Sequence, residues 1–295
     1  MNRKIDYKIN ENDTGKTVEG FLKERGYTHQ VLVRLKQTDH GILRNGIWAY
    51  TNERLCKDDL ITVQIVENEC SDNIAPVNLP LDIAYEDDDI IVINKPFDMP
   101  AHPSAGNHDN TLANALMYYY GSKNKPFVYR CINRLDRDTT GLTIVAKHAL
   151  AGGILGNAVA KRAIHRTYYA VCSGCTPACM RISAPIARKD ASTIERCVDF
   201  KRGENAVTDF IRIKYNPDNN LSLVKLRLLT GRTHQIRVHM KYIGFPLIGD
   251  FLYNPDYTYI SRQALHSGRL VFTHPVTGQK MNLISDIPSD MKSLF

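Results

Sequence analysis

The segment NRLDRDTTG (residues 133–141) alternates two arginines with two aspartates around a single leucine, and the apolar run LTIVAK (142–147) follows it. The run predicts a strand, which places the charged residues in the loop before it. An arginine on each side of an aspartate favours the ionised carboxylate of Asp136. Such a carboxylate can act as a nucleophile or general base, or it can belong to a structural ion-pair network. The segment alone leaves both interpretations open.

The flanking sequence predicts more strands than helices. We expect strands over 90–93, 142–147, 167–174, 206–215, 221–229, 269–274 and 280–285, and helices over 111–121, 148–164 and 233–244. Most connections are too short for the crossover that parallel strands need. The pattern therefore predicts an α+β fold with a mixed, largely antiparallel sheet flanked by helices.

The first 70 residues are predicted to form a small separate unit. A helical face is expected over 17–26, Asn45-Gly46 predicts a hairpin, and 60–67 alternates as a strand does, whereas 31–36 is ambiguous. A polar stretch with prolines then indicates a linker. We expect a small domain over 1–70, a linker over 71–82 and a larger domain over 83–295.

The net charge of +7 is unevenly distributed along the 295 residues. Residues 1–75 carry −1 (11 basic, 12 acidic), 76–110 carry −6 (1 basic, 7 acidic) and 111–295 carry +14 (26 basic, 12 acidic). A positive section of this size favours a polyanionic partner such as nucleic acid, with a merely soluble basic protein as the alternative. The 43% hydrophobic content argues against disorder, and no apolar run is long enough to span a bilayer.

The seven cysteines point to free thiols. Their number is odd and the polar N-terminus has no secretory signal pattern, so we expect a reducing, cytoplasmic setting. Cys172, Cys175 and Cys179 have a spacing that raises a metal hypothesis, but no further pair supplies a fourth ligand. We therefore favour cysteines beside a turn and expect no metal.

Five blocks in order resemble RluA-type RNA pseudouridine synthases. NRLDRDTTG is similar to the family signature around its catalytic aspartate. The other blocks are YEDDDIIVINKPFDMPAHPS (85–104), RAIHRTYYAV (162–171), LTGRTHQIRVHMKYIGFPLIGDFLY (229–253) and RQALHSGRLVFTHPVTG (262–278). Together they cover most of residues 80–290, which makes the resemblance highly specific.

The resemblance implies an isomerase that converts uridine to pseudouridine in structured RNA without a metal or organic cofactor. Its catalytic aspartate corresponds to Asp136, and Arg134, Tyr168 and Arg232 correspond to residues that bind RNA or support the site. The resemblance places Arg232 against Asp136 as an ion pair. The target base must leave the RNA stack, which requires a pocket that replaces its stacking contacts. His234 and His239 fall on the predicted helix over 233–244, where we expect a structural or supporting role.

Two features depart from the family pattern. Asn133 stands where the family usually has histidine, and it retains hydrogen-bonding capacity without the ability to become cationic. Residues 14–67 faintly resemble the alpha-L RNA-binding domain, yet that domain usually presents a basic face. This unit is therefore expected to be an RNA-binding domain or a degenerate, structural version of one.

The resulting hypothesis is a monomeric, cytoplasmic synthase that acts on ribosomal RNA, with no membrane partner and no cofactor. Transfer RNA is the alternative substrate. A catalytically idle RNA-binding or ribosome-assembly protein on the same fold is the alternative class of function. An idle relative is expected to lose at least one of Asp136, Tyr168 and Arg232, and all three are present.

Overall fold

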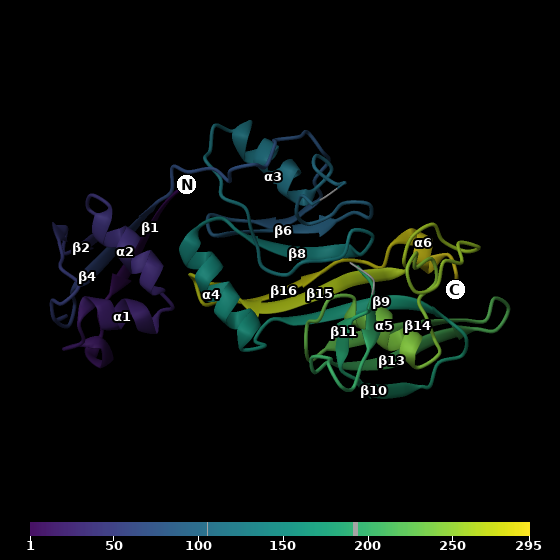
Figure 1. Ribbon diagram of the computed structural model, residues 1–295. Helices are drawn as coiled ribbons and strands as arrows, with labels where there is room; N and C mark the ends of the chain where they lie inside the picture. Colours follow the sequence, from purple (N-terminus) through teal and green to yellow (C-terminus); the bar gives the residue numbers. More distant parts are fainter. Residues whose placement is uncertain (105, 191–193) are drawn as a thin grey trace.

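The computed structural model describes residues 1–104, 106–190 and 194–295 and shows two units side by side (Figure 1). We call residues 1–67 the N-terminal unit and residues 83–295 the C-terminal unit. The first holds a four-stranded sheet, and the second is built on a ten-stranded sheet with a separate two-stranded hairpin. No helix in the described ranges is long and apolar enough to cross a bilayer.

The N-terminal unit packs two helices on a sheet with the strand order β1-β4-β2-β3. Its elements are β1 (Asn2–Lys8), η1 (Glu11–Asp13), α1 (Val18–Glu24), α2 (His29–Gln37), β2 (Ile42–Arg44), β3 (Ile47–Trp48) and β4 (Leu60–Val66). The expected helix, hairpin and last strand are formed, and the ambiguous stretch 31–36 lies within α2. Strand β1 was not expected, because its sequence is polar and only Ile5 is buried.

The C-terminal sheet has the strand order β10-β13-β14-β9-β15-β8-β6-β5, with β16 paired to β15 and β7 paired to β8. Its strands are β5 (Ile83–Glu86), β6 (Ile90–Lys95), β7 (Arg130–Cys131), β8 (Thr140–Ala146), β9 (His165–Ser173), β10 (Cys179–Ser183), β13 (Val207–Asn216), β14 (Leu221–Leu228), β15 (Leu265–Thr273) and β16 (Lys280–Ile284). The β8–β15 pair is parallel, and the other pairs are antiparallel. The predicted α+β fold with a mixed, largely antiparallel sheet is confirmed.

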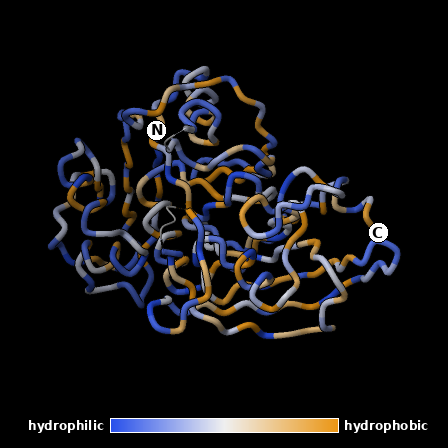
Figure 2. Tube along the Cα trace, turned by 45° about the vertical axis from the view of Figure 1, so that its right-hand side comes forward, coloured by the Kyte–Doolittle hydropathy of each residue, from blue (hydrophilic) through white to orange (hydrophobic). Residues whose placement is uncertain are grey.

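Helices cover both faces of this sheet. They are α3 (Leu112–Gly121), α4 (Ala149–Ala160), α5 (Gln235–Tyr242) and α6 (Ser289–Lys292), and the separate hairpin is β11 (Ile186–Arg188) with β12 (Arg196–Val198). Side chains of β6 and β8 alternate between a cluster under α3 and a cluster under α4, as the period of two requires. Helix α5 covers the half formed by β9, β13 and β14. Figure 2 shows hydrophobic stretches along these central strands.

Gly141 permits the close approach of β8 and β15 at the centre of the sheet. Its φ is +106°, and a Cβ atom there would lie 2.3 Å from the carbonyl oxygen of Ser267. Only glycine accommodates both the conformation and the contact. The loop that precedes β8 is thereby held next to β15.

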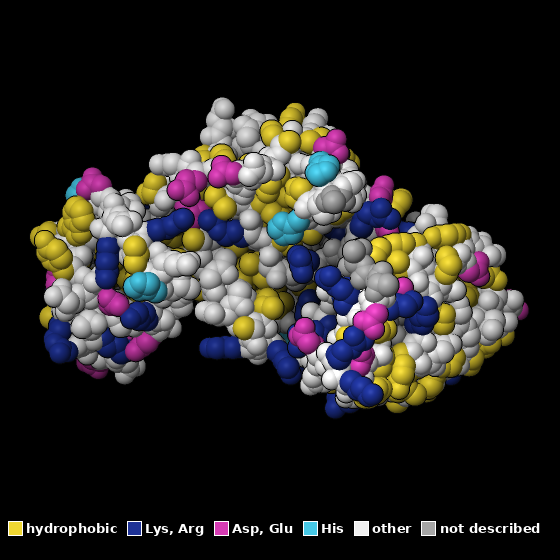
Figure 3. Space-filling view, viewed as in Figure 1, with side chains coloured by type: hydrophobic (Ala, Val, Ile, Leu, Met, Phe, Trp, Pro, Cys, Tyr) yellow, Lys and Arg dark blue, Asp and Glu magenta, His cyan; other side chains and the backbone are white. Residues whose placement is uncertain are grey.

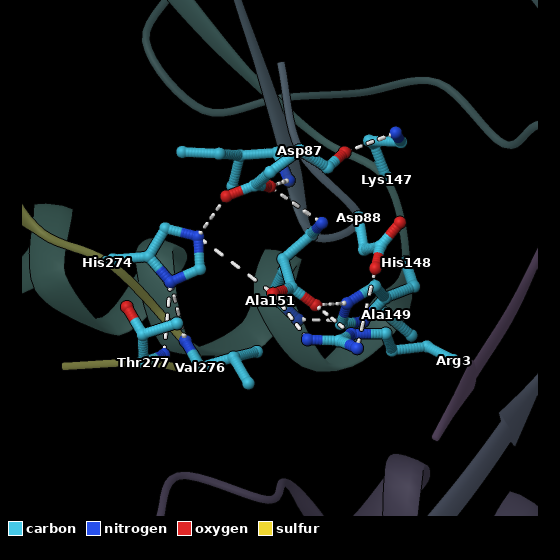
Figure 4. A network of polar contacts seen from close by, with 12 residues as sticks. Arg3, Asp87, Asp88, Lys147, His148, Ala149, Ala151, His274, Val276 and Thr277 are labelled. Atoms are coloured by element: carbon cyan, nitrogen blue, oxygen red, sulfur yellow. Dashed lines mark hydrogen bonds and ion pairs between the residues drawn. The ribbon is translucent and has the colours of Figure 1, made fainter. Parts of the chain in front are cut away.

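Buried polar contacts join the two units (Figure 4). Arg3 of β1 donates from Nε and Nη2 to the carboxylate of Asp89, at 2.7 and 3.1 Å. Asp89 is 2% exposed and also accepts from His148, the N-cap residue of α4, at 2.9 Å. Glu67 accepts from the backbone N–H of Ala149 at 2.8 Å. These contacts anchor the N-terminal unit to the start of α4.

The stretch between the units, 68–82, has no helix or strand but is not detached. Ile74, Leu79 and Leu81 pack against the cluster under α3, and the backbone N–H of Ser71 donates to Phe127. The segment expected as a linker therefore runs along the C-terminal unit.

Candidate active site

The loop between β7 and β8 carries Asp136 and is held in place by its own buried side chains. Asn133 is buried, its Oδ1 accepts from the backbone N–H of Ile144 at 2.8 Å, and its Nδ2 donates to the carbonyl of Leu142 at 3.3 Å. Leu135 is buried in the cluster under α5. Asn133 thus ties the loop to β8 through one donor and one acceptor, a role that needs no positive charge.

Helix α5 supplies the cation that contacts Asp136. Nη1 of Arg237 lies 3.0 Å from Oδ2 of Asp136, while Nε and Nη2 each lie 2.7 Å from the carboxylate of Asp250. Arg237 and Asp250 are 1% and 0% exposed. Burial disfavours the charged form of Arg237, but the hydrogen bonds to Asp250 and the field of Asp136 outweigh it and raise the pKa of Arg237. The guanidinium is therefore a fixed positive charge at Asp136.

The expected ion pair between Arg232 and Asp136 is not formed. Arg232 lies in the turn before α5, and it pairs with Glu204 and donates to the carbonyl of Asn205. The contact to Asp136 is made by Arg237 instead. Arg237 is buried within α5, whereas Arg232 precedes the helix and is exposed.

A sequence signal for Arg237 exists. It precedes Met240 by three residues, which places the two side chains next to each other on the predicted helix and Arg237 at the border of its apolar side. An arginine on that side requires a carboxylate partner, since an unpaired buried charge is costly.

His234 lies at the N-cap of α5 in a left-handed conformation, with a φ of 57°. Its Nε2 is 3.9 Å from Oδ2 of Asp136, and its Nδ1 is 3.0 Å from the hydroxyl of Tyr253. Burial lowers the pKa of His234, which favours the neutral ring. His239 points elsewhere and contacts Thr208 and the carbonyl of Ala184.

Asp136 opens into a cleft of about 950 Å³. The lining comes from four stretches, 100–104, 131–137, 159–166 and 227–234. Among the described residues, this lining contains six arginines and three histidines, and its one carboxylate is that of Asp136. Figure 3 shows Lys and Arg side chains gathered around this hollow. The cleft thus offers positive charge for a polyanion and a single carboxylate for chemistry.

A smaller hollow at the cleft bottom brings the other expected residues together. It measures about 80 Å³, and its lining includes Asp136, Arg134, Tyr168, Arg232 and Arg237. Tyr168 belongs to β9 and is 4% exposed. Arg134 is exposed toward the cleft. The four residues singled out in the sequence therefore share one site, although Arg232 does so without touching Asp136.

Lys95, at the end of β6, supports the same loop and was not expected as a site residue. Its ammonium group is buried and donates to the carbonyls of Pro96 and Arg137, at 2.7 and 2.8 Å. Burial lowers the pKa of Lys95 to about 7, and the fields of Asp138 and Asp136 only partly oppose this. The Lys-Pro pair in the block over 85–104 was the available signal.

The cysteine hypothesis gains no support among the described residues. There the side chains close enough to share a metal ion are Asp87, Asp89 and His274 (Figure 4). Nδ1 of His274 accepts from the backbone N–H groups of Val276 and Thr277, so the ring proton is on Nε2 and faces Asp87 at 2.8 Å. A metal ion needs the lone pair of that same nitrogen. The cluster is therefore a hydrogen-bonded anchor rather than a metal site.

Comparisons with known proteins agree with this geometry. The family model described as RNA pseudouridylate synthase matches residues 89–242. The uncharacterized RNA pseudouridine synthase YjbO of Bacillus subtilis is 38% identical over 95% of this chain and 98% of its own length. The ribosomal large subunit pseudouridine synthase D of Escherichia coli is 36% identical over 97% of this chain and 92% of its own.

A solved structure shows the same fold. Human RNA pseudouridylate synthase domain containing 1 superposes with a TM-score of 0.60 at 26% identity, over 70% of this chain and 83% of that one. The resemblance to RluA-type enzymes is thus confirmed, and with it the enzyme class rather than an idle binding protein. The chain belongs to the RNA pseudouridylate synthase family.

Proposed function

We propose that this RNA pseudouridine synthase modifies specific uridines of ribosomal RNA, with Asp136 as the carboxylate that attacks the substrate. The observation that carries the proposal is the composition of the cleft, in which one carboxylate stands among six arginines and three histidines. Relatives named ribosomal large subunit pseudouridine synthase D support ribosomal RNA over transfer RNA.

In this proposal, the arginines of the cleft bind the RNA. Arg134, Arg166 and Arg227 line the cleft and have no carboxylate within ion-pair distance among the described residues. Phosphate oxygens are the partners that such arginines bind in nucleic-acid complexes, and these contacts fix the register of the RNA. The target nucleotide can then be presented to Asp136.

The chemistry is an isomerisation that balances without a co-reactant. Attack by the Asp136 carboxylate on the target nucleotide leads to rupture of the bond between N1 of uracil and C1′ of ribose. The uracil turns, C5 bonds to C1′, the carboxylate is released, C5 loses its proton to solvent and N1 gains one. Arg237 donates to Oδ2 of Asp136 at 3.0 Å and gives the carboxylate a fixed orientation before it attacks.

The position of Asp136 supports base flipping as part of this proposal. The carboxylate is at the cleft bottom beside Tyr168, out of reach of a base within a helical stack. The flipped uracil loses its stacking neighbours, and the Tyr168 ring offers an aromatic replacement. Its hydroxyl also provides a proton acceptor in this hollow.

The test uses RNA labelled with tritium at C5 of uridine, because each turnover releases that hydrogen to water. Ribosomal RNA from cells that lack the gene and transfer RNA from the same cells form the two arms. We expect release from ribosomal RNA without added metal. Asp136→Asn should abolish release and retain RNA binding, because the amide keeps the shape but not the nucleophile.

Asp98→Asn is the matched control, since it makes the same chemical change at an exposed carboxylate of the neighbouring loop. It should leave the rate unchanged. Full activity of Asp136→Asn would overturn the mechanism, and release from transfer RNA alone would overturn the substrate.

A further inference from the structure

A chain of two hydrogen bonds leads from the β11–β12 hairpin to His234, whose ring faces Asp136. The backbone N–H of Arg196, on β12, donates to the Tyr253 hydroxyl oxygen at 2.9 Å. The same hydroxyl lies 3.0 Å from Nδ1 of His234. Nε2 of His234 faces Oδ2 of Asp136 at 3.9 Å. Three elements distant in sequence therefore converge on the carboxylate.

The first link determines where the protons are. An amide N–H can only donate, so it occupies a lone pair of the Tyr253 oxygen and leaves the hydroxyl hydrogen to be placed. Within the described part of the chain, the acceptor in reach of that hydrogen is Nδ1 of His234. A proton on Nδ1 would leave the hydroxyl hydrogen of the buried Tyr253 without a partner, which is costly. Nδ1 therefore accepts, and the ring proton is on Nε2.

This tautomer aims an N–H at one oxygen of Asp136. Arg237 donates to that same oxygen, Oδ2, at 3.0 Å. No described side chain donates to Oδ1. Arg237 hydrogen-bonds to Oδ2 and the Nε2–H of His234 faces it at 3.9 Å, so both groups lie on the Oδ2 side of the carboxylate and Oδ1 has no such neighbour among the described side chains.

We propose that His234 is a positioning residue, held by Tyr253 as the neutral Nε2–H tautomer, which together with Arg237 retains Oδ2 and presents Oδ1 as the oxygen that bonds to the substrate. The assignment of Oδ1 rests on the proposed role of Asp136, whereas the assignment of the His234 tautomer is independent of that role. His234 does not touch the substrate in this arrangement. It fixes which oxygen reacts and the angle at which it does so.

The burial of His234 and the charges around it are consistent with a neutral ring. Asp136 and Asp250 favour protonation, Arg237 and Arg196 oppose it, and Tyr253 is the remaining titratable group against the ring. Burial raises the pKa of Tyr253 to about 12, so it remains a donor at neutral pH. Tyr253 and His234 are therefore both neutral at neutral pH.

Nitrogen-15 NMR of the protein with ring-labelled histidine tests the tautomer directly, because pyrrole-type and pyridine-type nitrogens resonate far apart. His234→Phe identifies the signal by its loss. At pH 7.5 we expect a protonated Nε2 and an unprotonated Nδ1. Tyr253→Phe should shift His234 toward a mixture of tautomers. A protonated Nδ1 in the wild-type protein would overturn the proposal even where Asp136 is essential.

Kinetics separate positioning from mere structure. His234→Phe keeps the ring volume without a donor, while His234→Gln places an amide N–H near the Nε2 position. We expect His234→Phe to lower kcat roughly 10- to 100-fold with KM for ribosomal RNA unchanged, and His234→Gln to restore most of it. An equal loss of kcat in both variants, or a rise in KM alone, would contradict a positioning role for His234. Full activity of both variants would also contradict it.

Discussion

The N-terminal unit and the cleft at Asp136 use their positive charges in opposite ways. Ten of the eleven basic residues at positions 1–75 form ion pairs with carboxylates, and the eleventh, Arg54, donates to the carbonyl of Gly15. Of the six cleft arginines, only Arg137 and Arg232 have a carboxylate partner among the described residues. Basic side chains that already form ion pairs with carboxylates of their own unit are less available to bind RNA phosphates. The pairing of charges, more than their number, therefore indicates where RNA binds.

The ion pairs of the two regions also differ in burial, and breaking one from each gives the largest contrast. Arg237→Met leaves the fully buried Asp250 without its partner, so we expect a loss of about 3–5 kcal/mol in the free energy of unfolding, together with loss of activity. Lys23→Met breaks the exposed pair with Glu19 and should change stability little. Urea unfolding of both variants measures the contrast.

A double variant sharpens this result. Arg237→Met with Asp250→Asn removes both charges and keeps an acceptor for the backbone N–H groups of Leu252 and Tyr253. It should recover most of the stability but none of the activity, because Asp136 still lacks its cation. Recovery of both would show that Arg237 is only structural.

Neutralising unpaired cations should weaken RNA binding, whereas neutralising paired ones should not. For the double variant Arg134→Gln, Arg166→Gln we expect a loss of about 3 kcal/mol in binding free energy to ribosomal RNA and a salt-dependence slope reduced by about 2. The matched control, Lys8→Gln with Lys57→Gln, removes two lysines that pair with Asp58 and Glu11. Filter binding at several salt concentrations compares them, and equal weakening would reject the distinction.

Arg3 is the cation of the N-terminal unit whose carboxylate partner lies in the other unit. Its side chain is 25% exposed, but Asp89 is only 2% exposed. Arg3→Gln should therefore cost about 1–2 kcal/mol and increase amide exchange where α4 contacts the N-terminal unit. Lys4→Gln, on the same strand with a loose exposed pair, is the control. Unchanged exchange in Arg3→Gln would mean that apolar packing alone holds the units together.

The sequence predicted most of the fold and the location of the site, but not its internal pairing. Periodicity suffices for elements such as β8 and α3, whose burial follows from their own residues. It misses β1, whose polar sequence becomes a strand only because β4 offers a partner. The resemblance placed Asp136 and Tyr168 in one site. The same resemblance assigned the ion pair with Asp136 to Arg232. A linear motif carries no information about the helical geometry that buries Arg237 next to Asp136.

Lys95 was missed for a related reason: its role depends on burial that only the packed structure supplies. The comparison with the N-terminal unit is direct, since Lys16 pairs with two carboxylates that raise its pKa, whereas the pKa of the buried Lys95 falls to about 7. Between pH 7 and the ordinary value of 10.5, the unfolded chain holds a proton at Lys95 that the folded chain has lost. Raising the pH through this window therefore favours the folded state.

We expect the free energy of unfolding to gain up to about 1.4 kcal/mol per pH unit from Lys95 above pH 7. Lys95→Met removes this gain, so the difference between wild type and variant should widen from pH 7.5 to 9. Lys16→Met is the control, because its raised pKa places no titration in that range. Urea unfolding at three pH values measures the slope of the unfolding free energy against pH. Lys95→Met also removes two hydrogen bonds, but that loss is the same at each pH and does not change the slope. Parallel slopes for wild type and Lys95→Met would mean that Lys95 stays charged when buried, and the contrast with the N-terminal unit would then rest on the cleft arginines alone.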